Sequence, residues 1–182
     1  MDKGYLFVLI GAILAATLFV PLPVVVMYWW SRMTFWGYLL ISFGMRSIPG
    51  SQKELKYAQL ATLTTLAVQT LLSFGIGRSG ILNIALIILQ TFASMCIFFW
   101  LLKSEYMWSP STSKKIDLLM YSIIAAIFLV LQVSLILAIF SAPHLRIFLL
   151  TLQNALQFVN ILYYGILIFI LAKLYLDARK TL

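Results

Sequence analysis

The chain has 182 residues, of which 63% are apolar and only 10% are charged, and its mean hydropathy is +1.04. Such a composition excludes an ordinary soluble domain, and several apolar runs reach the roughly 20 residues that cross a bilayer core. The net charge of +8 does not indicate a nucleic-acid partner, because Lys and Arg gather in the short segments between the apolar runs, as in cytoplasmic loops of membrane proteins.

The first apolar run covers residues 5–30 and predicts a retained transmembrane helix, since its length exceeds that of a signal-peptide core and no polar segment follows it. Pro21 and Pro23 interrupt the run and predict a kink or an unwound turn in its second half. Ala12 and Ala16 form a pair of small residues four positions apart, a spacing suited to close helix contact.

The next run, residues 33–48, is short. Its apolar part, from Met33 to Met45, would reach only about 20 Å as a helix, less than the roughly 30 Å of a hydrocarbon core. Two interpretations follow. The segment is a short span anchored by Arg32 and Arg46, which gives six spans, or it is re-entrant or interfacial, which gives five.

Four further spans are predicted from the remaining apolar runs, and they cover residues 57–77, 81–102, 118–140 and 147–172. The expected fold class is therefore an all-α, polytopic transmembrane helix bundle that forms one integral membrane domain over residues 1–182. Membrane lipids are its expected surroundings.

The distribution of basic residues predicts the topology. The segments 46–56, 103–117 and the tail from Lys173 carry three Lys or Arg each, whereas the other two turns carry only Arg78 and Arg146. The positive-inside rule then places the C-terminus in the cytoplasm, with the chain in a cytoplasmic (inner or plasma) membrane. The N-terminus is inside in the six-span interpretation and outside in the five-span one.

A weak internal repeat relates residues 58–98 to residues 121–161. A shift of 63 positions, without a gap, aligns two glutamines with two others, together with several Leu and Ile that match easily by chance. The paired glutamines are Gln69 with Gln132 and Gln90 with Gln153. A true duplication would produce two hairpins of the same orientation, a parallel repeat of the kind that some transporters use.

A polar stripe runs along the last apolar segment. Gln153, Gln157, Asn160 and Tyr164 follow one another at steps of four, three and four residues, so they share one face of a helix. Amides that face lipid would lack hydrogen-bond partners, so this face should turn inward, where glutamines of other spans can meet it. The predicted ligand-binding residues are Gln69, Gln90, Gln132, Gln153, Gln157, Asn160 and Tyr164.

Two interpretations of these amides stay open. In the first, they hydrogen-bond between helices and serve packing alone, at about 1 kcal/mol or less for each pair. In the second, they line a pocket that holds a small neutral or zwitterionic molecule. The lack of charge beside the amides favours packing, whereas their number favours the pocket.

Catalytic and metal-binding patterns are missing from the sequence. All five acids lie in loops or at span ends, so no carboxylate is available at membrane depth to carry a proton. His144 is the single histidine and Cys96 the single cysteine, and no metalloprotease, hydrolase or phosphate-loop motif occurs. We therefore expect no enzyme activity, no cofactor and no metal site.

The sequence thus predicts a non-catalytic multi-pass protein that binds or helps to translocate a small neutral or zwitterionic solute, working with protein partners or as a homo-oligomer. The alternative is a structural or sensory subunit of a larger membrane complex, in which the amides serve helix packing only.

Overall fold

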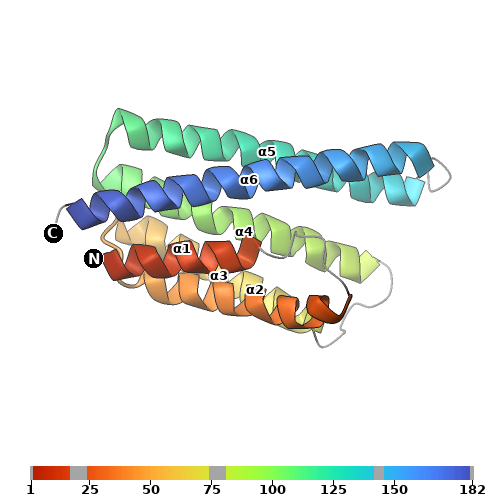
Figure 1. Cartoon of the computed structure of the whole chain (residues 1–182), viewed down its shortest axis with the longest axis horizontal. Coiled ribbons are helices and arrows are strands. Elements are labelled where there is room, and N and C mark those ends of the chain that lie inside the picture. The colour runs from red at the N-terminus through yellow and green to blue at the C-terminus, as the bar shows by residue number, and fades with distance from the viewer. Residues whose placement is uncertain (1, 17–23, 74–80, 142–145, 181–182) are drawn as a thin grey trace.

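The computed structural model describes residues 2–16, 24–73, 81–141 and 146–180, and these ranges form helices without any strand (Figure 1). The prediction of an all-helical fold is confirmed. The helices run back and forth along one common direction, so that successive helices are antiparallel (Figure 1). They are α1 (Asp2–Ala16), α2 (Val24–Met45), α3 (Gln52–Ser73), α4 (Ile81–Trp108), α5 (Thr112–Ser141) and α6 (Arg146–Lys180).

The first two helices divide the N-terminal region differently from the predicted runs. α1 ends at Ala16, and residues 24–30 belong to the same 22-residue helix as the short segment from Met33. α2 begins at Val24, the first described residue after the gap that follows α1. Pro21 and Pro23 themselves lie outside the described residues, so the predicted kink stays a prediction.

α1 and α2 form an antiparallel pair that is closed by glycines. A Cβ added at Gly11 would lie 2.5 Å from the carbonyl oxygen of Gly37, and one added at Gly44 would lie 2.6 Å from that of Gly4. On each helix the two glycines are seven residues apart, about two turns, and therefore share one face. We call these four residues the glycine interface. Ala12 is also fully buried.

One end of the bundle carries most of the charge. Both termini and the loops 46–51 and 109–111 lie at this end (Figure 1), which we call the charged end. Ten of the 13 Lys and Arg residues and all five acids are near it. The basic residues are Lys3, Arg46, Lys53, Lys56, Lys103, Lys114, Lys115, Lys173, Arg179 and Lys180.

Three of the described helices contain segments long and apolar enough to cross a membrane, namely Ile84–Trp108, Thr112–Leu135 and Leu150–Lys180. Lys3–Ala16 and Met33–Met45 are apolar but shorter. Membrane-spanning segments are therefore supported in α4, α5 and α6. The predicted total of six spans stays a prediction.

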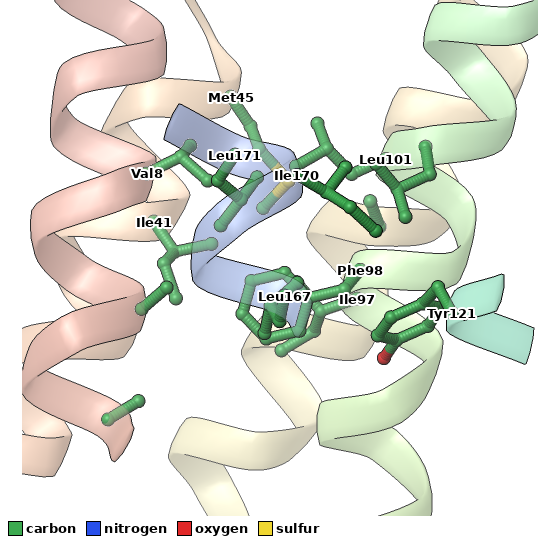
Figure 2. Packing of buried hydrophobic residues seen from close by; sticks show 14 of the residues in the cluster. Val8, Ile41, Met45, Ile97, Phe98, Leu101, Tyr121, Leu167, Ile170 and Leu171 are labelled. Carbon is green, nitrogen blue, oxygen red and sulfur yellow. The ribbon is translucent and has the colours of Figure 1, made fainter. Parts of the chain in front are cut away.

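The helix α6 packs between the two halves of the bundle. Its residues Leu167, Ile170 and Leu171 are at most 1% exposed. They lie between Ile41 of α2 on one side and Leu101 of α4 on the other (Figure 2). This packing fixes the position of α6, whose earlier turns carry the polar stripe.

Candidate functional site

A cavity of about 240 Å³ lies among α2, α4, α5 and α6, near the middle of the helices and away from the charged end. Its volume is about that of eight water molecules in the liquid. None of the lining residues is charged. They are Tyr38 of α2, Ile87, Gln90, Thr91 and Ser94 of α4, Phe128 and Gln132 of α5, and Leu156, Gln157, Asn160, Tyr163 and Tyr164 of α6.

The cavity brings together five of the seven residues predicted as ligand-binding, which are Gln90, Gln132, Gln157, Asn160 and Tyr164. Gln69 is buried on α3 and does not line it. The side chain of Gln153 lies outside the described residues. The three members of the α6 stripe that can be placed thus share one cavity, as their helical spacing requires. That these residues bind a ligand remains a prediction.

The orientation of the Gln132 amide follows from its neighbours. The Thr91 hydroxyl donates to the carbonyl oxygen of Ile87 at 3.0 Å, so its proton is used. Thr91 must therefore accept the hydrogen bond from Gln132 Nε2, at 2.9 Å. The amide oxygen Oε1 points elsewhere, is buried, and has no hydrogen-bond partner among the described residues.

Asn160 presents a second buried amide oxygen. Its side chain is only 3% exposed, and its Oδ1 has no hydrogen-bond partner in the described part of the chain. A buried polar atom left unpaired costs about 1–3 kcal/mol. Since Gln132 and Asn160 line the same cavity, a group that enters this space can offer the missing donors.

Aromatic residues form an ordered wall of the cavity. The Tyr121 hydroxyl donates to the carbonyl oxygen of Met95 at 2.9 Å, so Tyr163, whose hydroxyl is 2.7 Å away, donates to Tyr121. The ring of Phe128 stacks on that of Tyr163, with centroids 5.5 Å apart and planes inclined by 12°. The hydroxyl of Tyr163 is thus already used, and its ring serves as an apolar surface.

Seven of the twelve lining residues were not among those predicted to bind a ligand, and Tyr38 and Thr91 are two of the seven. The Tyr38 hydroxyl is hydrogen-bonded to Ser94 and Tyr164, which links α2 to α4 and α6. Thr91 had a signal in the sequence, because it precedes Ser94 by three positions and so shares its face of α4. Tyr38 had none, since no local pattern shows which distant helix α2 meets.

Two buried threonines of α3 differ from the cavity amides, because their polar groups are satisfied within their own helix. Thr62 and Thr65 are fully buried, and each hydroxyl donates to a carbonyl oxygen of its own helix at 2.9 Å, those of Ala58 and Ala61 respectively. These hydroxyls need no partner from another helix or a ligand. The predicted amides are therefore divided as well, because Gln69 is buried on α3 beside these hydroxyls, whereas Gln90, Gln132, Gln157 and Asn160 line the cavity.

At the charged end, ion pairs join the helices. Lys114 Nζ lies 3.3 Å from the buried carboxylate of Glu105, which also accepts a hydrogen bond from Tyr5. Lys173 Nζ lies 2.6 Å from the carboxylate of Asp117. These contacts connect α1, α4, α5 and α6 at a distance along the helices from the cavity, so they hold the bundle together without lining the site.

Within the described ranges, no three His, Cys, Asp or Glu side chains gather where they could hold a metal ion. The chemistry that the cavity offers is hydrogen bonding by neutral groups and contact with aromatic rings. Comparison with known protein families, with curated proteins and with solved structures finds no match to this chain.

Proposed function

We propose that this chain is a non-catalytic multi-pass membrane protein whose cavity binds a small neutral or zwitterionic solute. The observation that carries the proposal is the pair of buried amide oxygens, in Gln132 and Asn160, without partners among the described residues on a cavity of about 240 Å³. Buried amide oxygens cost free energy unless something supplies their hydrogen bonds, and both of these border a space that a solute can enter.

A six-span topology with both termini in the cytoplasm is part of the proposal. It is supported by the six described helices, by the apolar segments of α4, α5 and α6, and by the gathering of ten Lys and Arg at the charged end. Basic residues concentrate on the cytoplasmic side of membrane proteins. The cavity would then lie within the bilayer, since it is at mid-length of these helices.

The neutral lining favours an uncharged or internally compensated ligand. A single net charge at membrane depth is costly without a counter-charge, and no charged side chain lines the cavity. All five acids of the chain are near the charged end, so ion-coupled transport lacks its usual carboxylate. We therefore propose that binding, or transport with the help of partner subunits, is the role of the cavity.

Packing alone is the second candidate, and it also has support. The Gln132–Thr91 hydrogen bond joins α5 to α4, and the Thr62 and Thr65 hydroxyls are satisfied within α3. Such polar contacts stabilise membrane bundles without any ligand. In this alternative the chain is a structural or sensory subunit of a larger complex.

Native mass spectrometry of the gently solubilised protein tests the choice. We expect a small molecule to remain bound to the wild type and to Gln69→Leu, and to be lost from Asn160→Leu. The two variants make a matched pair, because each replaces a buried amide by the same apolar residue, outside the cavity in one case and on its wall in the other. A wild type that retains a protein partner but no small molecule would support the packing alternative instead.

A further inference from the structure

We infer that the solute offers an uncharged NH₂ group next to a flat apolar body, as in a primary carboxamide or an amino-substituted heterocycle. The inference rests on the proposed function and narrows its ligand class from neutral or zwitterionic to neutral and donor-rich. It is carried by the direction of the hydrogen bonds in the cavity wall.

The first step concerns the kind of polar group that is missing. The Thr91 hydroxyl donates its proton to the carbonyl oxygen of Ile87, so it can only accept from the NH₂ group of Gln132. The amide oxygen of Gln132 is therefore the atom that remains without a partner among the described residues. Asn160 contributes a second buried oxygen. Both atoms are acceptors, so the group that completes them must donate, as N–H or O–H does.

The second step concerns charge. An ammonium group also donates, but it would enter a lining without any carboxylate, where its desolvation is uncompensated. A carboxylate would leave the two unpartnered oxygens without donors, and no Lys or Arg lines the cavity to neutralise its charge. A neutral NH₂ group supplies the donors without either cost.

The third step concerns shape. The rings of Phe128 and Tyr163 both line the cavity and are nearly parallel, with planes inclined by 12°. The ring of Tyr164 stands nearly perpendicular to that of Tyr163, at 83° with centroids 5.0 Å apart. Two aromatic surfaces at a right angle suit a planar group, which can lie parallel to one ring and present its edge to the other. A carboxamide conjugated to a ring has this form.

Matched probes test the inference on the full-length protein in detergent. Binding of benzamide and nicotinamide would be measured by equilibrium dialysis and compared with that of their N,N-dimethyl analogues and of benzoate and nicotinate. The dimethyl analogues keep the flat body and the carbonyl but lose both donors, and the acids keep the size but add charge. We expect both amides to bind at least about tenfold more tightly than either set of controls, the cost of one unmade buried hydrogen bond.

Variants of the cavity wall test whether its two amide oxygens cause this selectivity. Asn160→Leu and Gln132→Leu should reduce the preference for the amides over their dimethyl analogues, whereas Gln69→Leu should keep it. Equal binding of amides and dimethyl analogues would overturn the inference and leave cavity binding intact. Binding of glycine betaine, lost in Asn160→Leu, in place of both amides would also overturn the inference while supporting the proposed function. If no probe binds and the wild type retains no small molecule, both the inference and the proposed function are contradicted.

Discussion

The hairpin of α1 and α2 and the hairpin of α5 and α6 show two opposite ways of pairing apolar helices. In the first, the glycine interface brings the backbones so close that an added Cβ would lie 2.5–2.9 Å from the facing carbonyl oxygens. In the second, amides and aromatic rings border a cavity, and the glycine of α6, Gly165, is exposed at the surface, where an added Cβ would meet no atom within 4 Å. Small residues let α1 and α2 pack closely, whereas large polar and aromatic residues of α5 and α6 border the cavity. We call the hairpin of α5 and α6 the open hairpin.

The difference follows from the physics of helix association in lipid. Apolar side chains gain little by leaving the lipid for each other, so close backbone approach and van der Waals contact stabilise a tight pair. Large amides prevent such an approach but need hydrogen-bond partners. The first hairpin is therefore closely packed, whereas the second contributes seven of the twelve residues that line the cavity.

The largest expected effect comes from a substitution in the glycine interface of α1 and α2. Gly11→Ala should destabilise the bundle by about 1–3 kcal/mol, the range for overpacking a filled interior, because its new Cβ would meet the carbonyl oxygen of Gly37, a backbone atom that cannot turn aside. Thermal unfolding followed by circular dichroism in detergent measures the change.

The matched control is Gly165→Ala on the open hairpin. The added methyl group has free space, and alanine is the better helix former by roughly 0.5–1 kcal/mol, so the variant should be unchanged or slightly more stable. Equal destabilisation by both substitutions would show that α1 and α2 do not pack as closely as the glycine interface requires.

A smaller effect concerns the charged end of the open hairpin. Lys173→Met removes the cation that lies 2.6 Å from Asp117 and 2.5 Å from the Ser113 hydroxyl. The Asp117 side chain is 11% exposed and that of Lys173 is 33% exposed. Because water reaches the lysine, we expect a loss of about 1–2 kcal/mol, below the 3–5 kcal/mol of a fully buried pair.

The double variant Lys173→Met with Asp117→Leu distinguishes the net contribution of the ion pair from the cost of leaving the Asp117 carboxylate unpaired. It should recover part of the stability lost in the single variant, since no unpaired carboxylate remains. Chemical unfolding of the purified proteins measures the free energy of unfolding of the single and the double variant. An additive loss in the double variant would mean that the two side chains do not interact.

The two hairpins also show how far the sequence predicts the site. Helical spacing was enough to place Gln157, Asn160 and Tyr164 on one face, and all three border the cavity. The face is buried at Asn160, whereas Gln157 is exposed. Spacing does not say which helix lies opposite. Gln69 and Gln132 correspond in the proposed repeat, yet one is buried away from the cavity and the other lines it.

The fold shows the same limit. The apolar runs predicted helices, but they supported five and six spans equally, because the short segment from Met33 to Met45 fits either a short span or a re-entrant segment. Seven-residue glycine spacing was present in both, at Gly4 and Gly11 and at Gly37 and Gly44, yet its meaning appears only when the two faces meet. The orientation of α3 with α4 matches that of α5 with α6 (Figure 1), as a parallel repeat requires, while the duplication itself stays a prediction.

The smallest expected effect lies outside both hairpins, at the start of α3. The Ser51 hydroxyl donates a hydrogen bond to the Glu54 carboxylate and lowers the pKa of that group. A folded-state pKa below the unfolded one, about 4.3, means that the contribution to stability is present above this pH and is lost as the pH falls through the folded value.

Ser51→Ala should therefore lower the stability slightly at pH 7 and leave it unchanged at a pH below the folded pKa, where Glu54 is protonated in either protein. Thermal unfolding of both proteins between pH 3 and pH 7, a range chosen to bracket the carboxyl pKa, measures the difference. Ser111→Ala serves as the control at another helix start, because the Ser111 hydroxyl accepts a hydrogen bond from the backbone N–H of Lys114 and contacts no carboxylate among the described residues. A difference that does not shrink toward acid pH would show that Ser51 acts by capping the helix α3 (Gln52–Ser73) rather than through the charge of Glu54. That result would leave the contrast between the two hairpins untouched, because neither hairpin contains this contact.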